Sequence, residues 1–351
     1  MFFSQLSTLS EEFSDKILTL IDSYFTSLTP SARKLITISK LSDAIQINYQ
    51  TTADVLRRGV EIGLLKKGFG VRCSECGTLF AEVDSLPDLL CVPSYCSTCE
   101  KVIDMDGIDY QYDIILLFSL NCAVPPFSKG QQDSPSVLNA PEGTVVHEDS
   151  LGSGVRYRLV TYDDLFSIST EKYEELKKLL MQVKQAHINT TEHGASLEFF
   201  IYNLFLQCIM FRATTKHRTQ INQIDIMIRV KGLIDCALFS RLGNSFYIEC
   251  KNEKNTPSID HLLKFRSLLH DAGMRFGIFI SRQKEPRTYR ENINHIFLKD
   301  DIVIVCFYLE EIERLLNKRE NLLECLDKKI TEVTTNPLHS LGKDCLHLFD
   351  A

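Results

Sequence analysis

The sequence predicts a mixed α/β protein in which a small helical module and a cysteine-rich segment precede a domain built on a mixed sheet. Three observations support this. Residues 223–228 and 246–252 are apolar, β-branched runs typical of strands, yet both carry acidic groups. Residues 10–72 follow the order helix, helix, helix, strand, and residues 73–99 contain two Cys-x-x-Cys pairs.

Composition and charge narrow the class of protein. The chain has 351 residues, enough for two or three domains, and a net charge of −7, so it lacks the overall basic character of a simple nucleic-acid binder. Local basic patches remain compatible with that total. Acidic residues from Glu11 onward come too early for a secretory signal, and no apolar run approaches the roughly 18 residues that span a bilayer. We therefore expect a cytoplasmic protein without a membrane segment, whose 12 cysteines are thiols or metal ligands.

Residues 1–72 are predicted to form a winged helix-turn-helix. Ser10, followed by two acids, marks the expected start of the first helix. Residues 52–62 form the helix in the recognition position, and residues 65–72 form the wing. Between residues 31 and 72, eight Lys or Arg stand against three acids, and phosphate contacts require such an excess. Winged helices bind either nucleic acid or protein, and both possibilities stay open.

Residues 73–122 are predicted to form a zinc ribbon. Two Cys-x-x-Cys pairs separated by 19 residues place four thiolates at the corners of a tetrahedron, which suits Zn²⁺. Four protein ligands leave no open position, so the expected role is structural. The predicted ligands are Cys73, Cys76, Cys96 and Cys99. Gly77 helps the backbone turn around the metal, and Cys91 is either an apolar filler or a substitute ligand.

Residues 123–155 are rich in Pro, Gly, Ser and Gln and are predicted to be a linker. The second domain is then 156–351. A helix beginning near Gly194 carries Glu198 close to its start. Residues 212–218 are interpreted as a basic loop that leads into the first acidic strand.

The rest of that domain follows an order of strand, helix, strand, strand and helix. Pro257 is expected at the first position of a helix, where its missing amide costs nothing, and Gly273 is expected to end that helix. Residues 276–281 and 301–306 are predicted to be buried strands, and a helix is expected over 309–329.

The acidic strands suggest phosphodiester chemistry. Period-two alternation places Glu249 and Lys251 on one face of the sheet, and Asp225 on a neighbouring strand completes a cluster. Mg²⁺ is held by one or two carboxylates and keeps positions for water and a phosphate oxygen. Lys251 would orient or help to deprotonate the attacking water and stabilise the charge that develops. Asp235 is the alternative to Asp225 as the first acid.

These residues resemble a known family. Glu198, Gln223-Ile224-Asp225 and the strand Phe246-Tyr247-Ile248-Glu249-Cys250-Lys251-Asn252 look like the restriction-endonuclease-like PD-(D/E)xK nucleases, closest to the Mrr-type branch. The resemblance covers roughly residues 193–308. It implies a mixed central sheet flanked by helices, Mg²⁺ dependence and cleavage of DNA. Asp225 and Glu249 would then be metal ligands, Lys251 the catalytic lysine and Glu198 an accessory acid, although no Pro precedes Asp225.

The sequence therefore predicts a Mg²⁺-dependent DNA endonuclease, acting in restriction or anti-phage defence. Cutting both strands with one active site per chain would require a homodimer. One alternative is a non-enzymatic DNA-binding regulator whose nuclease-like domain has lost activity. Another is a docking subunit whose winged helix binds a partner NTPase or helicase. A second Glu-x-Lys, at Glu175 and Lys177 on an expected helix surface, shows that the spacing alone is weak.

Overall fold

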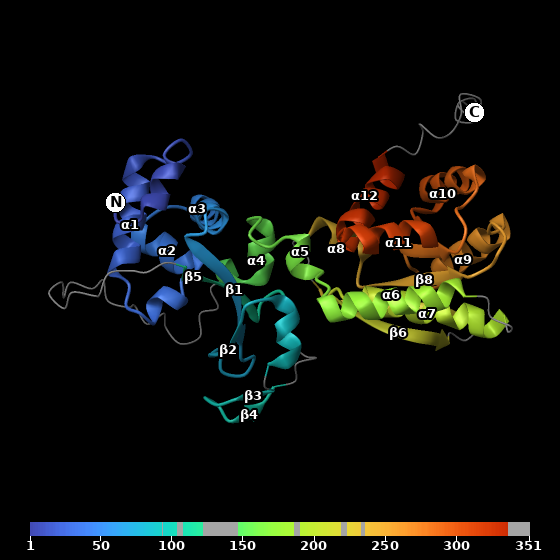
Figure 1. Ribbon diagram of the computed structural model, residues 1–351, viewed down its shortest axis with the longest axis horizontal. Coiled ribbons are helices and arrows are strands. Elements are labelled where there is room, and N and C mark those ends of the chain that lie inside the picture. Colours follow the sequence, from blue (N-terminus) through green and yellow to red (C-terminus); the bar gives the residue numbers. More distant parts are fainter. Residues whose placement is uncertain are drawn as a thin grey trace. The chain divides into compact units, whose positions relative to one another are not determined.

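The computed structural model describes residues 1–92, 94–103, 108–121, 147–185, 190–218, 223–232 and 236–335 (Figure 1). The chain is a mixed α/β protein, as predicted. It divides into two compact units. The N-terminal unit comprises Met1–Asp164, with which Cys236 is also grouped, and the C-terminal unit comprises Leu165–Gly232 and the residues from Ala237 onward. Each unit has its own sheet and its own core, and each is described separately below.

Three helices open the N-terminal unit, with two short 3-10 turns between them. The elements are η1 (Ser4–Leu9), α1 (Asp15–Ser27), η2 (Ala32–Lys34), α2 (Ile38–Ile45) and α3 (Tyr49–Glu61). Ser14, Thr37 and Asn48 cap the α-helices, because each side chain accepts a hydrogen bond from the amide three residues on. The expected first helix start at Ser10 is wrong, since Ser10 closes η1 instead.

The wing is a three-stranded antiparallel sheet in the order β2-β1-β5. Its strands are β1 (Leu65–Arg72), β2 (Leu79–Val83) and β5 (Ile114–Leu120). β5 pairs with β1 along almost its whole length, from Leu65↔Leu120 to Val71↔Ile114. The sequence assigned 73–122 to the ribbon, but β5 belongs to the wing. The apolar residues of β5 are buried in the core of the unit, whereas a small metal-binding ribbon would leave them exposed.

The cysteine-rich segment is inserted between β2 and β5. Its elements are η3 (Leu86–Cys91), β3 (Tyr95–Cys96) and β4 (Lys101–Val102). The first Cys-x-x-Cys lies in the turn between β1 and β2, and the second lies in the β3–β4 hairpin. The ribbon is therefore an extension of the wing rather than a separate module.

The predicted linker 123–155 is only partly described, because residues 123–146 lie outside the described residues. The remainder is folded, as η4 (His147–Asp149) and α4 (Leu151–Arg156), and α5 (Tyr162–Leu165) follows. The carboxylate of buried Asp149 accepts hydrogen bonds from the amide of Ser39 at 2.8 Å and from its hydroxyl at 2.5 Å. Asp149 thus binds the N-terminus of α2, which fixes residues 147–155 to the N-terminal unit.

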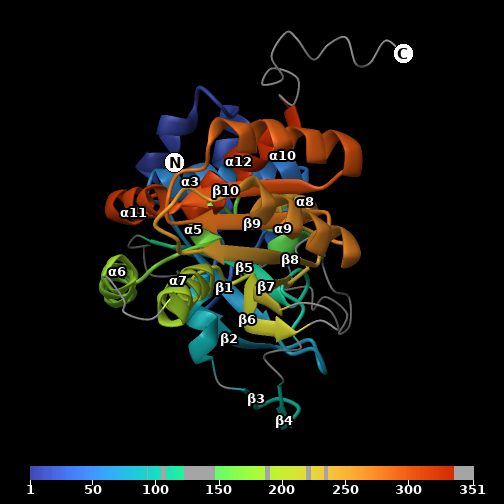
Figure 2. The ribbon, with the colours of Figure 1, turned by 90° about the vertical axis from the view of Figure 1, so that its right-hand side faces the viewer.

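The C-terminal unit contains a five-stranded mixed sheet, and its strands stack from β10 to β6 in Figure 2. β8, β9 and β10 are parallel, whereas β6, β7 and β8 are antiparallel. The strands are β6 (Phe211–Arg218), β7 (Gln223–Val230), β8 (Ser245–Lys251), β9 (Phe276–Ser281) and β10 (Val303–Tyr308). The helices are α6 (Thr170–Lys184), α7 (Thr190–Phe205), α8 (Ala237–Leu242), α9 (Ile259–Asp271), α10 (Arg287–Asp300), α11 (Leu309–Lys318) and α12 (Leu322–Thr335).

The element order of this unit agrees with the sequence only in part, with four corrections. The sequence predicted no helix between the strands at 276–281 and 301–306, but α10 lies there, because parallel β9 and β10 need a crossover connection. The basic stretch 212–218 is not a loop but most of β6, an edge strand, where Lys and Arg are common. Pro257 lies before α9, which starts at Ile259 after an extended Ser258. The helix expected over 309–329 is two helices, because Arg319 has a left-handed backbone with φ of 53°.

Candidate active site and metal centre

The four cysteines of the ribbon come together as predicted. The Sγ atoms of Cys73 and Cys99 are 3.7 Å apart, as are those of Cys76 and Cys96, and all four lie within 4.8 Å of one another. A tetrahedron with Zn–S bonds of about 2.3 Å has S···S edges of about 3.8 Å. The cluster therefore has the size and donor set of a zinc site. Cys91, at the exposed end of η3, is not part of it.

Tight turns bring these thiols together. Gly77, with φ of +71°, donates its amide to the carbonyl of Cys73 at 2.8 Å, and this closes the first turn. Hydrogen bonds from Thr78 lower the pKa of Cys76 to about 6, whereas burial raises the pKa of Cys99 to about 12. Four thiols this close cannot all ionise without a compensating cation. The donor set therefore fits a divalent metal held by thiolates.

In the C-terminal unit, β7 and β8 separate at the predicted acids. Their pairing runs from Arg229↔Ser245 to Ile226↔Ile248 and stops there. One residue further on, the Oδ2 atom of Asp225 accepts a hydrogen bond from the amide of Cys250 at 2.8 Å. A side-chain carboxylate thus replaces the next backbone partner in the ladder. Asp225 is thereby held beside the end of β8, where Glu249 and Lys251 lie.

The side chains of Glu249 and Lys251 lie on the same face of β8, at its C-terminal end, as the alternation predicts. Their side chains form an ion pair, with 12 % and 25 % of their side-chain surfaces exposed. Cys250 points to the other face and is buried, and burial raises the pKa of its thiol well above the usual range. Cys250 is accordingly a neutral packing group whose backbone amide positions Asp225.

The electrostatics of the pair of acids are unusual. Burial and then the charge of Glu249 raise the pKa of Asp225 to about 6, against the opposing effects of the Cys250 amide, Lys251 and Lys264. Burial lowers the pKa of Lys251, but Glu249 outweighs this, so the pKa ends above its ordinary value. The site therefore holds an ammonium group paired with Glu249, close to a carboxyl group, that of Asp225, whose ionisation is disfavoured.

Helix α9 covers the face of the sheet that carries these acids. Met227, Tyr247 and Gly277 are cross-strand neighbours on that face, and Glu249 follows two residues after Tyr247. A Cβ on Gly277 would lie 2.8 Å from the ring of Phe265 in α9, so only glycine allows the helix this close. Lys264 precedes Phe265 and is exposed, and its charge is felt at Asp225.

Glu198 lies on the other side of the sheet. Its helix, α7, packs its Phe205 against Phe246, which shares a face with Cys250. The charge of Glu198 contributes to the raised pKa of the Cys250 thiol. Among the residues that the structure describes, only the four ribbon cysteines form a group of three or more His, Cys, Asp or Glu ligands within 4.8 Å. Glu198 does not therefore join the other two acids in a cluster that tight.

The end of β8 has further contacts that the sequence did not suggest. The amide of Arg282 donates to the carbonyl of Lys251 at 2.9 Å, and its guanidinium donates to Asn252. The same guanidinium binds the C-terminal carbonyls of α6 at Val183 and Lys184. Nothing in the local sequence marks Arg282, because its role depends on contacts far apart in the chain. The rival acid Asp235 lies outside the described residues.

Comparison with known proteins found no matching family model, no matching curated protein and no matching solved structure. Among the described helices, none is long and apolar enough to cross a membrane.

Proposed function

We propose that the C-terminal unit is a metal-dependent nuclease of the PD-(D/E)xK type that hydrolyses DNA phosphodiester bonds. The observation that carries this proposal is the separation of β7 from β8, where Asp225 takes the Cys250 amide. That arrangement brings two carboxylates and a lysine from neighbouring strands to one sheet end. Surface Glu-x-Lys pairs have no such partner acid, burial or strand separation.

The donor set fits Mg²⁺, a hard cation that prefers oxygen ligands. Asp225 and Glu249 would hold it, and each has a carboxylate oxygen that the described hydrogen bonds do not use. Burial and then the negative charge of Glu249 raise the pKa of Asp225, and a bound divalent cation would favour the ionised carboxylate. When bound, the cation would supply a water activated near neutral pH and charge neutralisation at phosphorus.

Lys251 is the group that would act on the developing charge. Its raised pKa keeps it as an ammonium at neutral pH, so it is suited to donate hydrogen bonds rather than to remove a proton. The backbone of Arg282 and the carboxylate of Glu249 fix it at the strand end. We therefore assign Lys251 to orienting the attacking water and stabilising the phosphorane-like charge.

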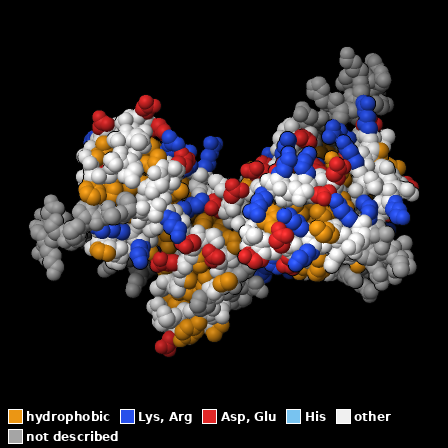
Figure 3. All heavy atoms as spheres, viewed as in Figure 1, with side chains coloured by type: hydrophobic (Ala, Val, Ile, Leu, Met, Phe, Trp, Pro, Cys, Tyr) orange, Lys and Arg blue, Asp and Glu red, His pale blue; other side chains and the backbone are white. Residues whose placement is uncertain are grey.

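The distribution of charge supports a polyanionic substrate for this unit. Residues 165–351 contain 26 Lys and Arg against 24 Asp and Glu, a net charge of +2, although the whole chain carries −7. In Figure 3, Lys and Arg side chains gather over the C-terminal unit on the face shown. Cleavage of invading DNA, as in restriction or defence, is the role we assign to such an activity.

The ribbon completes the proposal as a structural zinc centre. All four ligands come from the chain, so no coordination position is left for a substrate. Protein purified without chelators should contain one zinc per chain, measured by elemental analysis. A zinc content near zero in folded protein would contradict this part of the proposal.

The nuclease proposal is tested on supercoiled plasmid with Mg²⁺ or Mn²⁺. Wild type should nick or linearise the DNA, and Glu249→Gln and Lys251→Met should not. The matched control is Lys177→Met, because Lys177 follows Glu175 with the same spacing on the surface of α6. Equal cleavage by Glu249→Gln, or no cleavage of DNA or RNA by folded wild type, would reject the enzyme and leave the non-enzymatic DNA-binding regulator.

A further inference from the structure

The N-terminal unit is strongly acidic, although a winged helix that grips DNA is ordinarily basic. Residues 1–164 contain 13 Lys and Arg against 22 Asp and Glu, a net charge of −9. The whole negative charge of the chain therefore comes from this unit, since residues 165–351 carry +2. A unit with this net charge repels phosphate unless one of its faces carries a local excess of Lys and Arg.

The helix in the recognition position offers no such face. Arg57 pairs with Asp54 at 2.8 Å and lies 3.8 Å from Glu61. Arg58 pairs with Glu61 and with Glu12 of the preceding segment. Both arginines that the sequence counted toward a phosphate-binding excess are neutralised by acids. Glu12 lies outside the window in which the excess was counted.

The wing lysines are paired in the same way. Lys66 binds Asp84 at 2.7 Å, and Lys67 binds Asp164 at 2.7 Å and the carbonyl of Leu159 at 2.9 Å. Asp84 and Asp164 again lie outside the counted window. A phosphate would have to compete with each carboxylate for its lysine. The surface that a DNA-reading winged helix uses is therefore already occupied by internal ion pairs.

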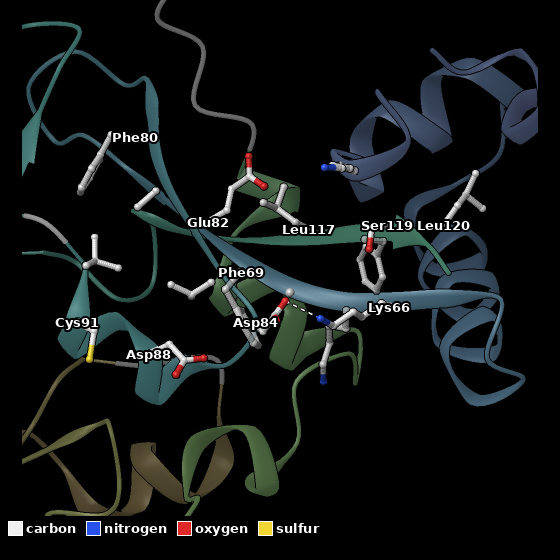
Figure 4. Close-up of a pocket in the computed structure, with 17 residues that line it drawn as sticks. Lys66, Phe69, Phe80, Glu82, Asp84, Asp88, Cys91, Leu117, Ser119 and Leu120 are labelled. Atoms are coloured by element: carbon white, nitrogen blue, oxygen red, sulfur yellow. Dashed lines mark ion pairs between the residues drawn. The ribbon is translucent and has the colours of Figure 1, made fainter. Parts of the chain in front are cut away.

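The same unit has a groove of about 900 Å³ on the wing sheet (Figure 4). Phe80, Val92, Leu117 and Leu120 supply apolar lining from β2, the end of η3 and β5. In Figure 4, Phe80 and Cys91 lie at one end of the groove, and Lys66 and Leu120 lie toward the other. The groove is thus an open channel that follows the strands and carries both apolar and charged side chains.

The groove opens where β2 leaves β1. The two strands pair only from Phe69↔Val83 to Arg72↔Leu79, while β1 continues along β5 to Leu65. On this side, residues 65–68 of β1 have no strand partner among the described residues. Because alternate residues of a strand face opposite sides, a groove lined by consecutive residues 66–69 reaches the strand edge. An unpaired edge beside apolar side chains accepts an added strand.

The charged side chains that line the groove indicate which kind of segment it binds. Lys66 and Lys67 are neutralised by Asp84 and Asp164, and Lys34 also lines the groove. Glu82 of β2 and Asp88 of η3 have no basic partner among the described residues. We propose that this groove binds an extended segment of another protein that alternates apolar and basic side chains. Its backbone adds to the free edge of β1, its apolar residues contact the lining, and its Lys or Arg face Glu82 and Asp88.

The test uses the full chain and a fluorescein-labelled nonapeptide that alternates Lys and Val. Binding is followed by fluorescence anisotropy. Glu82→Lys should weaken binding at least tenfold. Glu11→Lys, an equal charge change on exposed η1-flanking surface, should change it less than twofold. The same peptide with alternate amides N-methylated keeps its charge but cannot extend a sheet, and it should bind at least tenfold more weakly.

Each remaining outcome counts against the proposal. Equal binding of the N-methylated peptide, or equal effects of Glu82→Lys and Glu11→Lys, would mean general attraction to an acidic surface. A Glu-Val peptide that binds as well as the Lys-Val peptide would refute the charge assignment. Anisotropy with a 20-base-pair duplex covers the nucleic-acid alternative. A loss of more than threefold in DNA affinity for Arg57→Ala with Arg58→Ala would show that α3 reads DNA and would overturn the proposal. None of these readouts depends on nuclease activity.

Discussion

The two units use acidic residues in opposite ways. In the N-terminal unit, several acids lie at the surface and neutralise a nearby Lys or Arg, as Asp54 and Glu61 do for the arginines of α3. In the C-terminal unit, Asp225 and Glu249 lie close together at one strand end, where burial and then the charge of Glu249 disfavour the ionisation of Asp225. Paired surface charges contribute little to the free energy of folding, and each charge already has its counter-charge. Buried carboxylates held close together, in contrast, favour the binding of a cation. Ionisable groups perturbed in this way cluster at functional sites.

The largest expected effect separates the units by their dependence on metal. Cys96→Ser removes a fully buried ligand of the ribbon cluster. Structural zinc contributes about 10 kcal/mol or more to the folding of small metal-centred modules. We expect loss of the zinc and of hydrogen-exchange protection in β1 to β4, with protection of β8 and β9 unchanged. Protection lost equally in both units would show that the two do not fold independently.

The next effect concerns catalysis in the C-terminal unit. Removing a group that stabilises transition-state charge costs a factor of about 10² to 10³ in kcat. We expect losses of that size for Lys251→Met, measured as plasmid cleavage under single-turnover conditions, with Lys177→Met unchanged. The melting temperature of Lys251→Met should fall, because Glu249 loses its ion-pair partner, so cleavage is compared at a temperature where both proteins are folded. Full cleavage by the folded variant would mean that Lys251 serves mainly to compensate Glu249.

The sequence predicted the C-terminal unit better than the N-terminal one, for a physical reason. Strands β7 to β10 are buried, so their apolar runs report directly on structure, and 276–281 is confirmed residue for residue. The common face of Glu249 and Lys251 was predictable because side chains alternate along a strand with period two, and Asp225 lies beside them. Arg282 was not, because its contacts join β9 to α6, and no local pattern encodes them.

In the N-terminal unit, the sequence misjudged what depends on distant partners. The basic excess of five counted over 31–72 falls to two once Glu12, Asp84 and Asp164, which lie outside that window, are included as ion-pair partners. β5 was assigned to the ribbon for the same reason, since its pairing with β1 crosses the whole insertion. The Cys-x-x-Cys pairs were predicted correctly because the turns that form them are local.

A moderate effect tests whether the surroundings of Asp225 in the C-terminal unit disfavour its ionised carboxylate. The folded-state pKa of Asp225 is about 6, above the ordinary value of 3.8, so the folded protein binds this proton more tightly than the unfolded chain. The associated stability is present below about pH 4 and is lost as the pH rises through 6. Two pKa units correspond to at most about 3 kcal/mol.

Asp225→Asn keeps an acceptor for the Cys250 amide but cannot ionise. Without divalent cations, urea unfolding should show the variant more stable than wild type at pH 7, with the difference vanishing near pH 4. Addition of Mg²⁺ should stabilise wild type and leave the variant unchanged. A difference that does not depend on pH would show that the carboxylate is not held in an unfavourable environment.

The smallest effect tests how residues 147–155 are held in the N-terminal unit. Asp149→Ala removes the acceptor of both Ser39 hydrogen bonds at the N-terminus of α2 and should cost about 1 to 2 kcal/mol of unfolding free energy. Asp22 offers a matched comparison, because its carboxylate also accepts two hydrogen bonds, from the amides of Phe2 and Phe3, but at a more exposed site. Asp22→Ala should therefore cost less than Asp149→Ala in chemical denaturation. An equal or larger cost for Asp22→Ala would mean that burial of Asp149 offsets its hydrogen bonds, since burial raises the pKa of that carboxyl against the Ser39 contacts.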